Sequence, residues 1–80
     1  MRYLKDKNKQ FTLVLKNLRK EKKLTQEELA DKAGINEKYF GRIERGESSP
    51  TFKTIVKICS AIDIKISKFM ALVELENKKK

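Results

Sequence analysis

The sequence contains no histidine and a single cysteine, Cys59. One cysteine excludes a disulfide within the chain, and without histidine there is no Cys/His set to hold zinc. The apolar runs fall far short of the roughly 20 residues that a membrane-spanning helix needs. Lysine and aspartate occupy the N-terminal region, where a secretory signal has its apolar stretch. We therefore expect no metal, no cofactor and no membrane-spanning segment, and a reducing, cytoplasmic location.

Residues that favour strands and turns are also scarce. The chain has three glycines, one proline, four phenylalanines, two tyrosines and no tryptophan. This composition favours helices joined by short connections. With 80 residues, of which 39% are hydrophobic, the chain is long enough for one modest core. We expect one domain over residues 9–76, between a flexible basic arm at residues 1–8 and a basic tail at residues 77–80.

Positive charge is in excess. Lys and Arg number 20 against 11 Asp and Glu, which gives a net charge of +9. On so small a body this charge favours polyanions, with nucleic acid the first candidate and an anionic membrane surface the second. Lysines near the two ends explain part of the excess as solvated tails. Basic residues also lie inside the patterned region, namely Lys16, Arg19, Lys20, Lys22, Lys23, Lys38, Arg42 and Arg45.

The apolar pattern of the first half is helical. From about residue 9 to residue 22, the core candidates recur at the spacing of one helix face: Phe11, Leu15 and Leu18. Residues 25–28, TQEE, form a capping box that starts a second helix, and Gly34 ends it. Asn36 is a good N-cap for a third helix at 37–45. Two short helices joined by a glycine-containing turn predict a helix-turn-helix over residues 25–45.

Two further helices are expected in the second half. Ser49 is the predicted cap of the first, with Pro50 in its first turn. Its apolar stripe consists of Phe52, Ile55, Val56, Cys59 and Ile62. Asp63 is expected to take a left-handed turn conformation, and Ser67 to cap the last helix. Cys59 on this stripe is read as a small core residue, because no second cysteine is present for a redox pair.

Three segments carry a resemblance to a known family: LTQEELADKAGI, YFGRIERG and KICSAIDI. In this order and spacing they resemble the phage-repressor (Cro/XRE-type) helix-turn-helix transcriptional regulators, over roughly residues 10–70. The resemblance implies an all-α, five-helix, lambda-repressor-like DNA-binding domain. It also implies that residues 37–45 lie in the major groove of double-stranded DNA. Asp63, Lys65 and Glu47 depart from the usual family pattern, and Glu47 makes the loop after the motif less basic.

The resemblance implies a set of base contacts and a phosphate contact at Gln26, and the chemistry of helix N-termini and of polar side chains adds further phosphate candidates. The base-contacting set is Asn36, Glu37, Lys38, Gly41 and Arg42. The phosphate-contacting set is Thr25, Gln26, Tyr39, Arg45, Lys53 and Thr54. Arginine suits the O6 and N7 acceptors of guanine, and glutamate can accept from the amino group of cytosine. Four of these assignments have a plain alternative: Arg42 and Lys38 as solvated surface charges, and Glu37 and Arg45 as charges that complement the helix dipole.

The resemblance also implies an internal ion pair between Arg19 and Glu44 that fixes the angle between two helices. One such domain reads too few base pairs for a unique site, so we expect a homodimer on a pseudo-palindromic operator. No separate dimerisation segment is recognisable, and the interface is expected on the last helices, at Ile64, Ile66, Phe69, Met70 and Val73.

The expected function is therefore transcriptional regulation. A stand-alone domain of this length is similar to the controller proteins of restriction-modification systems. An antitoxin or a phage or plasmid repressor that works with a protein partner is the alternative, and RNA polymerase or a cognate partner is a possible second protein. Enzymatic activity is not expected, because no serine or cysteine sits beside a plausible base. RNA binding is disfavoured by the absence of an aromatic strand platform.

Overall fold

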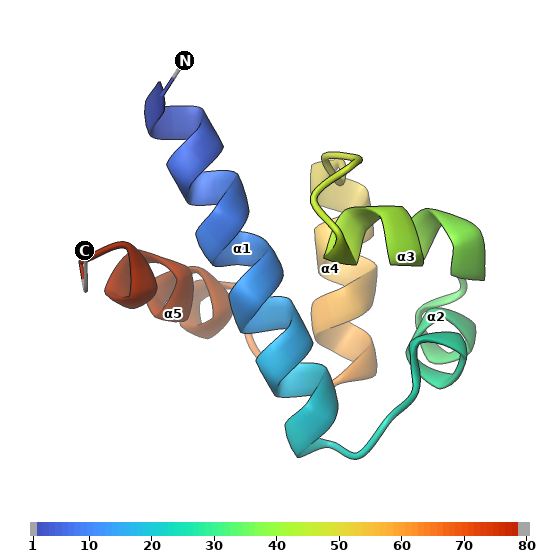
Figure 1. The fold of residues 1–80 in the computed structure, drawn as a ribbon. Helices are drawn as coiled ribbons and strands as arrows, with labels where there is room; N and C mark the ends of the chain where they lie inside the picture. Colours follow the sequence, from blue (N-terminus) through green and yellow to red (C-terminus); the bar gives the residue numbers. More distant parts are fainter. Residues whose placement is uncertain (1, 79–80) are drawn as a thin grey trace.

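The protein is described by a computed structural model that covers the backbone of residues 2–78 and the side chains of residues 9–78. The described residues form five helices and no strand (Figure 1). They are α1 (Arg2–Glu21), α2 (Gln26–Ala33), α3 (Glu37–Glu44), α4 (Phe52–Ala61) and α5 (Ile66–Lys78). The all-α, five-helix prediction is confirmed. No helix in this described part is long and apolar enough to cross a membrane.

The first helix begins earlier than the apolar pattern indicates. Its backbone is helical from Arg2 instead of from about residue 9. Residues 2–8 contain neither glycine nor proline, so nothing in them interrupts a helix. In Figure 1 these first turns extend beyond the neighbouring helices. Helix α5 likewise runs into the predicted basic tail, as far as Lys78. Residues 1 and 79–80, the remainder of the predicted arm and tail, lie outside the described residues.

The turns on either side of α2 follow local rules. The Thr25 hydroxyl accepts from the Glu28 amide at 3.0 Å, and the Glu28 carboxylate accepts from the Thr25 amide at 2.8 Å. Gly34 ends the helix with φ at +71°, a conformation that costs other residues about 1–2 kcal/mol. Asp63 adopts the same left-handed region after α4, with φ at +56°. The capping box and both left-handed turns agree with the sequence pattern.

The starts of α4 and α5 differ from the prediction. Thr51, and not Ser49, is the N-cap of α4, and its hydroxyl accepts from the Thr54 amide. Pro50 therefore lies just before the helix, where its missing N–H costs nothing. Helix α5 begins at Ile66, so Ser67 lies within its first turn and is not its cap. At α4 the Thr51 side chain thus provides the cap that was expected from Ser49.

One core joins all five helices. Its largest fully buried side chains are Phe40, Phe69, Leu15, Leu29, Ile43, Ile58, Val73 and Cys59. Phe11 of α1 and Phe69 of α5 meet edge to face, with ring centroids 5.1 Å apart. Burial raises the pKa of the Cys59 thiol, which fits an inert core position. Phe52 was expected on the inward face of α4, but at the first residue of that helix it is 70% exposed, although Cys59, two turns further along the same stripe, is fully buried.

Two residues expected at a dimer interface are buried in the core of the monomer. Phe69 and Val73 are fully buried within the monomer, because α5 packs its apolar face against α1. They have no surface to offer a second copy, so the prediction that they line the interface is wrong. Ile64 and Ile66 are half-buried, and Met70 is 37% exposed. Of the five residues expected at the dimer interface, these three are still accessible.

Candidate nucleic-acid interface

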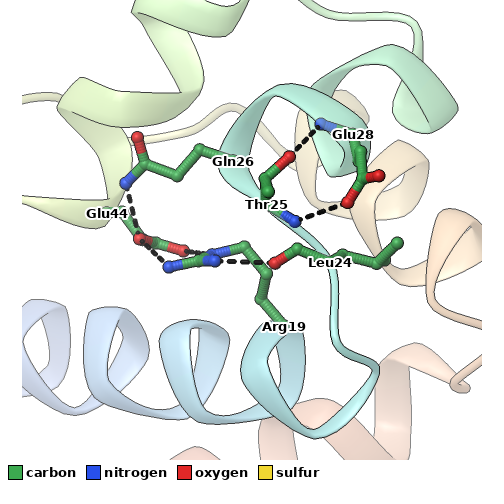
Figure 2. Close-up of polar contacts among 6 residues, drawn as sticks. All are labelled: Arg19, Leu24, Thr25, Gln26, Glu28 and Glu44. Atoms are coloured by element: carbon green, nitrogen blue, oxygen red, sulfur yellow. Dashed lines mark hydrogen bonds and ion pairs between the residues drawn. The ribbon is translucent and has the colours of Figure 1, made fainter.

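Three helices are tied together by one buried carboxylate, Glu44 at the end of α3 (Figure 2). Its Oε2 accepts from Nε of Arg19 at 2.6 Å, and its Oε1 accepts from Nη2 of Arg19 at 3.1 Å. Nε2 of Gln26 donates to the same Oε1 at 2.7 Å. Nη1 of Arg19 donates to the Leu24 carbonyl at 2.7 Å. The pair implied by the family resemblance is present, and Gln26 and Leu24 extend it.

This network sets the angle of α3. The side chains of Arg19 and Glu44 are only 11% and 2% exposed, so their charges are shielded from solvent and satisfied by each other. The network joins the end of α1, the start of α2 and the end of α3. A helix whose end is held in this way presents its outer face in a fixed direction, as reading of a groove requires.

That outer face lines an open hollow on the surface. Six residues form its walls and floor: Gln26, Glu37, Lys38, Gly41, Arg42 and Arg45. Three of the six are basic, and Lys38 and Arg42 project from the same helix face because they are four residues apart. Six of the residues predicted to contact DNA are thus brought together at one place. Gly41 forms part of the floor, where it leaves room that a side chain would fill.

Asn36 stands apart from this hollow. Its Oδ1 accepts from the amides of Lys38 at 2.8 Å and of Tyr39 at 3.1 Å, so its carbonyl oxygen serves as the N-cap of α3. Only its amide N–H groups remain for a base. Tyr39 is half-buried and packs against the core. Asn36 therefore caps a helix and Tyr39 packs against the core, in addition to any contact that either makes with DNA.

The phosphate candidates are placed less uniformly. Lys53 is exposed in the first turn of α4, outside the hollow. Thr54 is buried and its hydroxyl lies 3.0 Å from that of Thr51, so it supports the cap of α4 and does not face solvent. Thr25 is exposed, but its hydroxyl is engaged in the capping box. The starts of α2 and α4 remain phosphate candidates, because helix N-termini favour anions.

A second ion pair lies beside the hollow and was not predicted. Nε of Arg45 donates to Oε2 of Glu47 at 2.9 Å, and Nη2 donates to Oε1 at 3.1 Å. Both side chains are more than half exposed, at 57% and 54%. The hydrogen bond from Arg45 lowers the pKa of Glu47, and the positive charges of Arg45 and Arg42 act in the same direction. The two residues flank Gly46, which turns the chain back at a φ of +78°.

In helix-turn-helix proteins the second helix of the motif lies in the major groove of DNA, and in this chain that helix carries the outward hollow. A family model described as helix-turn-helix matches residues 15–69 of this chain. The chain therefore belongs to the helix-turn-helix family.

Particular relatives are regulators of transcription. The chain is 39% identical to the uncharacterized HTH-type transcriptional regulator YqaE of Bacillus subtilis, over 70% of this chain and 48% of YqaE. It is 40% identical to the immunity repressor protein of Bacillus phage phi105, over 66% of this chain and 37% of the repressor. The chain thus spans half or less of the length of these two relatives.

A solved structure matches over nearly the whole chain. The restriction-modification controller protein C.Esp1396I superposes with a TM-score of 0.87 at 28% identity, covering 92% of this chain and 96% of the controller. The same controller has been solved as a tetramer in complex with its natural 35 base-pair operator. That structure superposes on this chain with a TM-score of 0.83, at 28% identity and over 89% of this chain and 93% of the controller.

Proposed function

We propose that this protein is a sequence-specific, double-stranded DNA-binding transcriptional regulator that acts as a homodimer on a pseudo-palindromic operator. The observation that carries the proposal is the hollow on the outer face of α3, lined by Lys38, Arg42 and Arg45. Helix α3 enters the major groove with this face toward the bases. The Glu44 network holds the helix at the angle that this insertion needs.

Base contacts come from the first two turns of α3. Arg42 offers two donors to the O6 and N7 acceptors of guanine, and Lys38 offers a single point charge. Glu37 is exposed at the start of the helix, where it accepts from a cytosine amino group or complements the helix dipole. Phosphate contacts come from Lys53, from the amide group of Gln26 and from the main chain at the starts of α2 and α4.

The homodimer supplies the specificity that one recognition helix lacks. Its interface is formed by Met70, with the half-buried Ile64 and Ile66 beside it. The operator tetramer formed by the controller C.Esp1396I supports assembly on DNA as the mode of action. The structural match to C.Esp1396I over 92% of this chain and 96% of the controller favours the controller reading.

A phage or plasmid repressor, or an antitoxin with a protein partner, is the second candidate, and the match to the phi105 immunity repressor favours the repressor form. In either reading the second protein is RNA polymerase or a cognate partner. The protein carries out no enzymatic reaction. It works in the bacterial cytoplasm, where the DNA lies.

The test is binding of the purified protein to DNA upstream of its own gene, compared with scrambled DNA, over a series of salt concentrations. We expect a specific complex that weakens steeply with salt, because phosphate contacts release counterions. Arg42→Ala should abolish the preference for the specific DNA. Lys68→Ala, which removes an exposed positive charge from α5, is the matched control and should retain it. Equal, weak binding to both DNAs by the unaltered protein would refute the proposal.

A further inference from the structure

The Arg45–Glu47 pair is built into the end of α3. Gly46 adopts a left-handed φ of +78°, and the Glu47 amide donates to the Arg42 carbonyl at 2.8 Å. The Gly46 amide donates to the Ile43 carbonyl at 3.0 Å, which completes a helix-ending turn of the Schellman type. This backbone turn brings the Glu47 side chain back beside Arg45. The position of the carboxylate is therefore fixed by the end of the helix as well as by its ionic partner.

The geometry of the pair leaves one edge of the arginine free. Glu47 occupies the edge formed by Nε and Nη2, at 2.9 and 3.1 Å. The remaining edge, formed by Nη1 and the second hydrogen of Nη2, has two parallel donors. Two parallel donors on one arginine edge match the O6 and N7 acceptors of guanine. The free edge of Arg45 has the geometry of a base reader.

The free edge lies over the middle of α3. A methyl group placed on Gly41 would lie 3.2 Å from Nη1 of Arg45 and 3.5 Å from Oε1 of Gln26. The guanidinium therefore folds back across the backbone of α3 at Gly41. It shares the hollow with Arg42 and Lys38, and does not extend away from the helix end.

We infer that Arg45 reads a guanine in the major groove and that Glu47 is the residue that positions it. The inference rests on the proposed function, and it replaces the phosphate role expected for Arg45 from its sequence position and charge. Glu47 locks the side chain in one orientation, so less conformational freedom is lost on binding. Gly41 leaves the space in which the guanidinium lies.

The charge of Glu47 argues against a phosphate role. A carboxylate bound to an arginine at the DNA surface lies close to any phosphate that the arginine holds, and the two negative charges repel. A base edge is neutral overall, so the same carboxylate carries no such penalty there. The pair is also too exposed to be a stabilising element of the fold, because solvent-exposed ion pairs contribute little.

The experiment is selection of binding sites from a pool of random-sequence duplexes, carried out with the unaltered protein, Arg45→Lys and Glu47→Gln. Arg45→Lys keeps the charge but removes the two-donor fork. We expect the unaltered protein to select a guanine in each half-site that Arg45→Lys no longer selects, a loss of roughly 5- to 150-fold in discrimination. Glu47→Gln should weaken selection at that same position by a smaller factor and leave the other positions unchanged. Thermal unfolding should be the same for all three proteins.

Three results would overturn the inference. If Glu47→Gln bound every duplex more tightly with unchanged base preferences, Arg45 would be a phosphate anchor that Glu47 restrains. If Arg45→Lys selected the same sites as the unaltered protein, Arg45 would read no base. The proposed function would still stand in that case if the selected sites contained base pairs whose selection depends on Arg42. If the unaltered protein selected no sequence at all, the proposed function would fail and this inference with it.

Gly41→Ala provides an independent check. The added methyl group should displace the Arg45 guanidinium by a few tenths of an ångström, because it would lie 3.2 Å from Nη1. Alanine is the better helix former, so the variant should fold at least as well as the unaltered protein. We expect weakened selection at the Arg45-dependent guanine. Unchanged selection in a folded Gly41→Ala protein would count against the placement of Arg45 over Gly41.

Discussion

At the scale of single residues, the two ion pairs of this protein have opposite roles although their chemistry is the same. Arg19 and Glu44 are almost entirely buried and hold three helices together. Arg45 and Glu47 are more than half exposed and lie beside the hollow on α3. Burial decides the difference, because a buried charge that loses its partner cannot be solvated by water. The first pair is structural, and the second is free to serve recognition.

Glu44→Ala should therefore destabilise the fold. The substitution leaves the Arg19 guanidinium and the Gln26 amide without their hydrogen-bond acceptor. We expect a loss of about 3–5 kcal/mol in the free energy of unfolding. Urea denaturation followed by circular dichroism measures it. Glu47→Ala is the matched control and should leave the denaturation midpoint unchanged.

A double variant separates the cost of leaving one buried charge unpaired from the stability that the ion pair itself contributes. Arg19→Met combined with Glu44→Leu should lose less stability than Glu44→Ala alone, because it leaves no unpaired charge in the interior. A double variant less stable than Glu44→Ala would show that the ion pair itself carries the stability.

At the scale of elements, Asn36 has two assigned roles that the structure makes separable. Its Oδ1 caps α3, and the family resemblance also assigns it a base contact. Serine is an equally good N-cap but has a shorter side chain without an amide. Asn36→Ser should therefore keep the stability of the protein, whereas Asn36→Ala should lose about 1 kcal/mol.

The DNA affinity of Asn36→Ser then decides between the roles. We expect weaker binding to specific DNA, measured by fluorescence anisotropy at fixed salt, if the amide N–H groups reach a base. Affinity equal to that of the unaltered protein would assign Asn36 to helix capping alone.

At the scale of the whole molecule, the position of the proposed dimer interface follows from the apolar side chains that the monomer core leaves exposed. Helix α5 turns Phe69 and Val73 inward and leaves two large apolar residues exposed, Met70 at 37% and Leu75 at 55%. Met70 lies toward Ile66, whereas Leu75 lines a groove against α1. The proposed interface contains Met70 and not Leu75.

Met70→Glu should weaken dimerisation at least tenfold, because two-fold symmetry brings the new charge of each copy toward the other copy. Sedimentation equilibrium over a range of protein concentrations measures the dissociation constant. Leu75→Glu adds the same charge to an exposed apolar position of the same helix and should leave dimerisation unchanged. The reverse outcome would move the interface to the α1–α5 groove.

Features that depend on a few neighbouring residues could be predicted from the sequence. The capping box at Thr25 and Glu28, the Asn36 cap and the left-handed turns at Gly34 and Asp63 each follow from a side chain or backbone preference acting within one turn of helix. The order of the helices and the helix-turn-helix itself follow from the same local signals. The resemblance to the family added the roles of the outward residues, which periodicity alone does not assign.

The tertiary structure decided which side of each amphipathic helix is buried and which outward charges meet. Phe52 and Phe69 are both apolar residues on helical stripes, yet the first is exposed and the second is fully buried. Spacing defines a stripe, but the neighbouring helices determine how wide a part of it they cover. The Arg45–Glu47 pair depends on the exact turn at Gly46, which places two side chains in register after the helix has ended. The sequence by itself thus determined the elements and most of their caps, because those free energies are local, and only packing determined the surface that we propose as the DNA-binding face.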